Sequence, residues 1–138
     1  MRLRAPMPRL GPVKARWLAH QGRSRRAVMA RCLKNGALHC EGCDRPGPLD
    51  YSHVVGRRNI VGEPFASSPE LTQGLCRECH RRYDSYAVSA LRRKLEEAAI
   101  LRLATRYHKP LLVDALRHPM DAIRRMVAEL EKEGAGAE

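Results

Sequence analysis

Four of the five cysteines fall into two pairs whose spacing suits a metal site. Cys40 and Cys43 form the first pair, Cys76 and Cys79 form the second, and 32 residues separate the pairs. Two residues between cysteines let a tight turn aim both sulfurs at one ion, and two such turns complete a closed tetrahedral zinc site. The alternatives are two disulfides or four buried core thiols. Both are less common than a zinc site when this spacing occurs in a cytosolic protein, where thiols stay reduced. We expect a structural Zn²⁺, with Cys32 packed in the core instead of binding the ion.

Further metal-competent side chains lie close to these pairs in the sequence. His80 and Asp84 are four residues apart, so on a helix that begins at the second pair they share one face. Asp50 stands three residues before His53 in a strand-like segment. A hairpin tied to that helix by zinc would bring the four side chains around a second, incompletely coordinated site. The alternative for each is an ordinary structural role, such as a solvated or capping carboxylate.

The charge balance predicts a polyanionic partner. The chain has 26 Lys and Arg against 15 Asp and Glu, a formal net charge of +11, and only five of the cations are lysines. Arginine suits forked contacts to phosphate. Residues 1–40 carry ten bases and no acid, which predicts a nucleic-acid contact there. A solvated basic helix face or a flexible tail is the alternative. The clustered arginines of this arm are Arg23, Arg25, Arg26 and Arg31.

Hydrophobic spacing and turn residues divide the chain into four parts. These are a basic N-terminal arm or helix at 1–36, a zinc-stapled core at 37–86, C-terminal helices at 87–134 and a frayed tail at 135–138. We expect helices over 13–34, with a point of division at Gly22 to Ser24 and a stop at Asn35-Gly36, over 87–107 and around 120–130. We expect strands at 50–55 and 72–75. The residues expected to face inward on the C-terminal helices are Val88, Leu91, Leu95, Ala98, Ile100 or Leu101, Met120, Ile123, Val127 and Leu130.

The predicted fold class is therefore α+β, with a small zinc-stapled core and helices on both sides. No apolar run approaches the roughly 18 residues that a membrane span needs. Met1 to Arg4 is not followed by the apolar core of a signal peptide, so we expect a cytoplasmic protein. The apolar faces of the C-terminal helices suit a homodimer or a protein partner as well as the core.

Two stretches together resemble the HNH, or ββα-metal, nucleases. They are LDYSHVVGRR at 49–58 and SPELTQGLCRECHRRYD at 68–84, and the resemblance covers residues 38–85. The zinc-knuckled branch is the most similar, in particular the compact enzymes encoded by phages and prophages, often near recombination functions. The resemblance implies a ββα-metal core of the treble-clef kind, and a phage-encoded chain would act in the host cytoplasm.

The resemblance also implies a role for each metal-competent residue. His53 matches the histidine that deprotonates a water, a task that suits imidazole near neutral pH. His80 matches the helix ligand of the catalytic divalent ion, and Asp84 stands where many members have a second histidine. A carboxylate there favours Mg²⁺ or Mn²⁺. Asp50 is the candidate third ligand, because Ser52 occupies the position just before the general base. The products would carry a 5′-phosphate and a 3′-hydroxyl.

Four arginines beside these residues are expected to grip the DNA backbone. They are Arg57, Arg58, Arg81 and Arg82, of which Arg57 is the candidate for stabilising transition-state charge. Many HNH nucleases have an asparagine just before the second cysteine pair. Residues 71–74 of this chain read LTQG instead, and Asn59 is the candidate substitute.

These features predict a metal-dependent DNA endonuclease, with either low sequence specificity or recognition of DNA shape. The alternatives are a zinc-stapled nucleic-acid-binding module without cleavage, and an accessory protein for phage assembly or recombination. A binding module has no need to group His53, His80 and Asp84, so this grouping separates the hypotheses.

Overall fold

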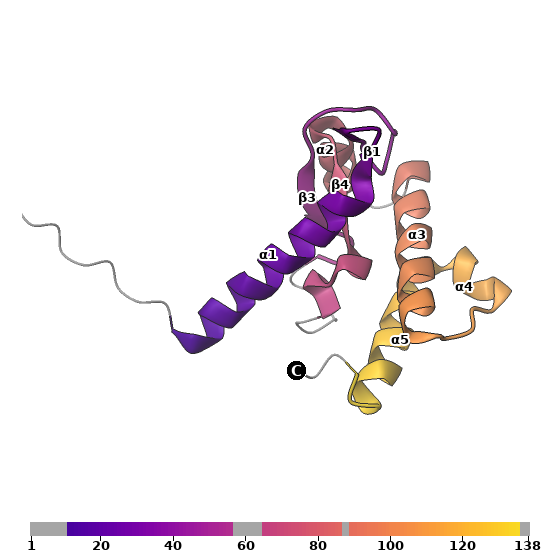
Figure 1. The fold of residues 1–138 in the computed structure, drawn as a ribbon. Helices are drawn as coiled ribbons and strands as arrows, with labels where there is room; N and C mark the ends of the chain where they lie inside the picture. The colour runs from indigo at the N-terminus through magenta and orange to yellow at the C-terminus, as the bar shows by residue number, and fades with distance from the viewer. Residues whose placement is uncertain (1–10, 57–64, 87–88, 136–138) are drawn as a thin grey trace, which may run out of the picture.

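The computed structural model describes residues 11–56, 65–86 and 89–135 and combines helices with short antiparallel strands (Figure 1). This confirms the α+β class predicted from the sequence. The elements in chain order are α1 Pro12–Cys32, β1 Leu33–Lys34, β2 Ala37–Leu38, β3 Asp50–His53, the 3₁₀ turns η1 Phe65–Ser67 and η2 Pro69–Leu71, β4 Thr72–Leu75, α2 Arg77–Ser85, α3 Ala90–Tyr107, α4 Val113–Arg117 and α5 Pro119–Lys132.

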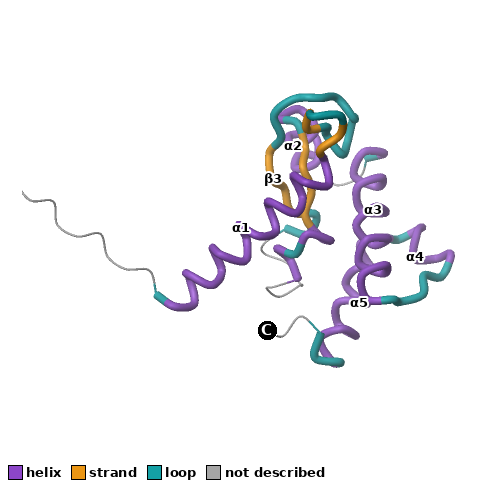
Figure 2. Tube along the Cα trace, in the orientation of Figure 1, coloured by secondary structure: helices purple, strands orange, loops and turns teal. Residues whose placement is uncertain are grey.

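A hairpin and a helix pack together beside the cysteine pairs. Strands β3 and β4 pair antiparallel, with Asp50 opposite Leu75 and His53 opposite Thr72. All four residues of β4 are buried, whereas β3 is only partly covered. Helix α2 follows β4 directly and lies beside the hairpin (Figure 2). The predicted strand at 72–75 is confirmed, and the predicted strand at 50–55 ends two residues early, at His53.

Helix α1 is continuous, so the expected division at Gly22 to Ser24 is wrong. Ser24, Val28 and Cys32, spaced four residues apart on one face, are all buried, and their packing outweighs the low helix propensity of Gly22. The N-terminal half of α1 extends away from the rest of the molecule (Figure 1). The helix ends at Cys32, and Asn35-Gly36 forms the turn between β1 and β2. Both turn residues have positive φ, as a two-residue hairpin of this hand requires.

Helices α3 and α5 pack together and form the larger hydrophobic core. Ile123, Val127 and Leu130 are buried on α5, as their spacing predicts. On α3, Ile100 is buried and Leu101 is 47% exposed, which resolves the open choice between them. The other buried residues of this cluster are Val54, Val55, Phe65, Leu71, Ala99, Leu103, Ala104 and Met126. Val88 lies outside the described residues.

Apolar side chains are exposed on and near α4. Leu112 and Val113 are 79% and 74% exposed, and Leu116 is 37% exposed. A homodimer or partner contact through these C-terminal helices stays a prediction. Within the described ranges, no helix has both the length and the apolar character needed to cross a bilayer.

Candidate functional site

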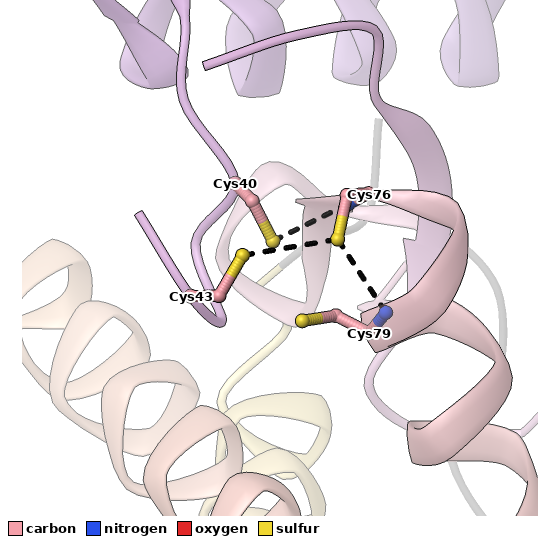
Figure 3. A group of neighbouring side chains, drawn as sticks. All are labelled: Cys40, Cys43, Cys76 and Cys79. Atoms are coloured by element: carbon pink, nitrogen blue, oxygen red, sulfur yellow. Dashed lines mark hydrogen bonds between the residues drawn. The ribbon is translucent and has the colours of Figure 1, made fainter. Parts of the chain in front are cut away.

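The four paired cysteines converge on one point between the loop at 40–43 and the start of α2 (Figure 3). Their sulfur atoms all lie within 4.8 Å of one another, and Cys43 Sγ is 3.8 Å from Cys76 Sγ. Sulfurs bound tetrahedrally at about 2.3 Å from zinc are about 3.8 Å apart. The cluster could therefore hold a structural metal such as zinc, and its four thiolates would leave no open coordination position. Cys32 is buried outside the cluster, as predicted.

Backbone and arginine N–H groups already point at the sulfurs. The N–H groups of Gly42 and Cys76 each donate to Cys40 Sγ at 3.3 Å, and Cys79 N–H donates to Cys76 Sγ at 3.5 Å. Arg45 Nε donates to Cys43 Sγ at 3.4 Å, and this bond is the main reason why the pKa of Cys43 falls to about 6. Burial instead raises the pKa of Cys79, so a cation is needed to hold that thiolate inside. The donor set fits a metal that binds thiolates.

The turn of the first cysteine pair, the first knuckle, leaves little room for a side chain at Gly42. A Cβ at this position would lie 3.1 Å from Cys79 Sγ and 3.0 Å from Leu91 Cδ1. Two residues later, Asp44 adopts a left-handed conformation with φ 64° and donates its N–H to Cys40 O at 2.8 Å, which closes the turn. The turn therefore places both sulfurs of the first pair toward the second pair.

A carboxylate inside this knuckle ties it to the rest of the molecule. Glu41 accepts hydrogen bonds from Arg31 Nε and Nη2 at 3.0 and 2.8 Å and from Gly74 N–H at 2.9 Å. Nη1 of Arg102, from α3, lies 3.7 Å from Oε2 of the same carboxylate. Arg31 and Arg102 both donate to the carbonyl oxygen of Thr72. One carboxylate thus connects the knuckle, α1, α3 and β4.

This network changes the role of Arg31. The sequence predicts that Arg31 contacts nucleic acid together with the other arginines of the basic arm. In the structure its guanidinium instead donates hydrogen bonds to the Glu41 carboxylate and to the carbonyl oxygens of Pro69 and Thr72. Nothing in the spacing of the sequence pairs Glu41 with an arginine 61 residues away. Sequence reasoning therefore missed Glu41 and Arg102.

A second polar group surrounds His80 on the first turns of α2. Nδ1 of His80 lies 3.1 Å from Asp50 Oδ2, and Nε2 lies 3.3 Å from Asp84 Oδ2. The side chains of His80 and Asp50 are about one-third exposed, and that of Asp84 is 65% exposed. Arg77 approaches Asp50 at 3.7 Å. The structure therefore brings together three predicted residues, Asp50, His80 and Asp84, in a position open to solvent.

His53 lies at the end of β3 and contacts a different set of residues. Its Nε2 is 3.4 Å from Ser67 Oγ, and its ring packs edge to face on Tyr51 at 5.3 Å between centroids. Successive side chains of a strand point to opposite faces, so His53 and Tyr51 share one face and Asp50 lies on the other. These described contacts of His53 do not include Asp50, His80 or Asp84, and the role of His53 stays a prediction.

The predicted phosphate-binding arginines that the structure describes lie on α1 and α2. Arg81 and Arg82 are exposed on α2, and Arg82 pairs with Glu78 at 3.2 Å. Arg23, Arg25 and Arg26 are exposed on α1. The guanidinium carbon of Arg25 lies 5.3 Å from the centre of the Tyr51 ring, on the His53 side of the hairpin. The predicted residues Arg57, Arg58 and Asn59 lie outside the described residues.

Within the described ranges, the four cysteines are the one group of three or more ligand-type side chains close enough to share an ion. The carboxylates of Asp50 and Asp84 do not join such a group because they approach different nitrogens of His80. Comparison with protein-family models, with curated proteins and with solved structures gave no match.

Proposed function

We propose that the chain is a metal-dependent DNA endonuclease of the HNH type, stapled by one zinc ion. The order of elements supports this proposal: a cysteine knuckle, a β hairpin, a second knuckle and a helix whose first turn carries His80. The finer assignment of a ββα-metal core rests on this order and on the sequence resemblance. A DNA backbone is the polyanion that suits a net charge of +11.

The observation that carries the proposal is the arrangement of carboxylates on the two nitrogens of His80. Histidines that bind a metal through one nitrogen commonly donate the other N–H to a carboxylate, which fixes the tautomer. Asp50, at 3.1 Å from Nδ1, fits this orienting role. Nε2 and Asp84 Oδ2 are then free to bind one ion, and their 3.3 Å separation is near the roughly 3.0 Å expected between adjacent ligands of Mg²⁺.

This assignment refines the role expected for Asp50, from third ligand to the residue that orients His80. A divalent ion held by His80 and Asp84 would supply Lewis-acid stabilisation of charge on the scissile phosphate and the leaving oxygen. His53 accepts the proton of the attacking water, and the neighbouring Arg25 and the exposed Arg81 hold the flanking phosphates. Because none of these groups reads base edges, we expect low sequence specificity.

Helix α1 is the proposed track for the DNA backbone. Its N-terminal half stands away from the rest of the molecule (Figure 1), and residues 1–40 contain no acidic side chain. Arg23, Arg25 and Arg26 are exposed on it. Arginine contacts to phosphates displace counterions, so binding should weaken steeply as salt is raised.

A second candidate function is nucleic-acid binding without cleavage. The contact of His53 with Ser67 favours it, because that contact lies on the face of the hairpin opposite Asp50. The two functions share the zinc site and the basic helix, and they differ in whether His53 and the His80 group act on one phosphate.

Replacing His53 by alanine should slow the cleavage of supercoiled plasmid by about 10²-fold to 10⁴-fold, because a positioned general base is lost. The assay compares zinc-loaded protein in Mg²⁺, in Mn²⁺ and without added divalent ion. DNA binding, measured by gel shift, should change little. His118→Ala, which removes an exposed histidine at the start of α5, is the matched control and should cut at the normal rate.

No cleavage by the unmodified chain with either ion, together with normal DNA binding, would leave only the binding function. Equal cleavage by the His53→Ala protein would instead remove His53 from the reaction.

A further inference from the structure

A mixed polar and aromatic cavity of about 280 Å³ lies between α1, the two 3₁₀ turns and the end of α3. Its inner wall contains the buried residues Ser24, Phe65 and Ser68. Tyr107 adds a second aromatic ring, 6.1 Å from Phe65 between ring centroids. Pockets for drug-sized molecules have volumes of about 300–1,000 Å³. This cavity is slightly smaller, so its volume suits a ligand the size of a single heterocyclic ring system.

Charged groups at this cavity divide between its interior and its rim. Glu70 lines the cavity with a side chain that is only 12% exposed. Arg23 and Arg106 also line it and are exposed, and Arg106 NH1 lies 3.4 Å from Glu70 Oε1. A carboxylate among aromatic walls disfavours a bare phosphate as the occupant but accepts hydrogen bonds from an exocyclic amino group. The two arginines suit a phosphate at the rim.

The cavity is connected to His53 by a short chain of contacts. Tyr51 OH donates to Ser24 Oγ at 3.0 Å and lies 3.3 Å from Ser67 O. Ser67 Oγ in turn lies 3.4 Å from His53 Nε2. Ser24 therefore belongs both to the cavity wall and to the group around His53. The cavity wall and His53 thus share one hydrogen-bonded network.

We propose that this cavity accepts an unpaired nucleobase of a DNA strand, so that the protein selects bulged, branched or flapped DNA over paired duplex. Base recognition of this kind stacks the extruded ring between aromatic and apolar side chains and reads its polar edge. The selection of a cutting site rests on the proposed nuclease function, whereas the binding preference does not.

The test is a binding measurement with zinc-loaded full chain and no added divalent ion. The probe is a duplex with a one-nucleotide bulge of 2-aminopurine, compared with the fully paired duplex and with a free deoxynucleoside monophosphate. We expect about tenfold tighter binding to the bulged duplex and a change in 2-aminopurine fluorescence on binding, as stacking of one base on an aromatic ring implies. Equal affinity for the two duplexes would overturn the proposal. An affinity for the free deoxynucleoside monophosphate as high as that for the bulged duplex would also overturn it.

Two variants locate the effect in the cavity. Ala27 lines the cavity from the exposed side of α1, so Ala27→Leu should fill it and abolish the preference for the bulge. Ala30→Leu makes the same change at an exposed position of the same helix outside the cavity lining and should keep the preference. Tyr107→Leu retains apolar volume but removes the ring, and should also abolish the preference. A preference that survives both cavity variants would place the bulge elsewhere.

The outcomes also separate this proposal from the nuclease function. A bulge preference without cleavage in Mg²⁺ or Mn²⁺ would support the cavity and contradict the nuclease. Cleavage without a bulge preference would support the nuclease function and contradict the role of the cavity.

Discussion

Replacing Cys79 by serine should leave the chain without a cooperative thermal unfolding transition. Cys79 is 4% exposed and belongs both to the metal cluster and to the smaller core, with Leu75, Tyr83 and Leu95. Apparent zinc-binding free energies in small domains are about 10–16 kcal/mol, which is comparable to or larger than the roughly 5–15 kcal/mol stability of a typical domain. Circular dichroism melting and zinc content by mass spectrometry measure the effect.

Cys32→Ala is the matched control because Cys32 is equally buried but lies outside the cluster. It should lower the melting temperature by a few degrees and keep one zinc per chain. A Cys79→Ser protein that retains its zinc and melts normally would contradict the assignment of the metal to these four thiolates.

Replacing Glu41 by alanine should lower the free energy of unfolding by about 3–5 kcal/mol, the range found when one partner of a buried ion pair is removed. The Glu41 side chain is 18% exposed, and those of Arg31 and Arg102 are 28% and 20% exposed. Without the carboxylate, Arg31 and Gly74 N–H each lose one acceptor, and Arg102 loses a nearby negative charge. Urea unfolding of the zinc-loaded protein measures the change.

The surface pair of Arg93 and Glu97 provides the control, since both residues are exposed or half-exposed on α3. Glu97→Gln should cost only a few tenths of a kcal/mol. Similar effects from the two substitutions would show that the Glu41 network contributes no more than a surface ion pair.

The same carboxylate predicts how stability depends on pH. Burial alone would raise the pKa of Glu41, but the hydrogen bonds from Arg31 and Gly74 outweigh it and hold the pKa below its ordinary value of 4.5. The unfolded state therefore takes up a proton at higher pH than the folded state. The contribution of Glu41 to stability is complete above pH 4.5 and is lost as the pH falls through the lower, folded-state pKa.

The parts of the fold that the sequence predicts are those fixed by local spacing. The two knuckles are specified by four cysteines and Gly42, all within short segments, so the converging cysteine cluster follows directly from the sequence. The strand at 72–75 and the inward face of α5 follow from simple hydrophobic patterns. Each of these features is determined by residues that lie close together in the sequence.

Features that depend on contacts distant in the sequence could not be predicted. The continuity of α1 depends on Ser24 and Val28 packing against residues 40 or more positions away, which local propensity at Gly22 does not reveal. In the sequence Glu41 lies between Cys40 and Cys43 with no nearby sign of a partner, and only the fold brings Arg102 to it. The face on which His53 lies depends on strand register, which a single residue shift would reverse.

The proposed function requires two metals, a zinc ion on the four cysteines and a second divalent ion on His80 and Asp84. A titration of the zinc-loaded chain with Mn²⁺, followed by electron paramagnetic resonance of the free ion, tests it directly. The account predicts one Mn²⁺ bound per chain, with binding lost in Asp84→Asn and kept in Asp114→Asn, which changes an exposed aspartate on α4. A chain that binds no Mn²⁺, or an Asp84→Asn protein that binds it as well as the unmodified chain, would contradict the claim.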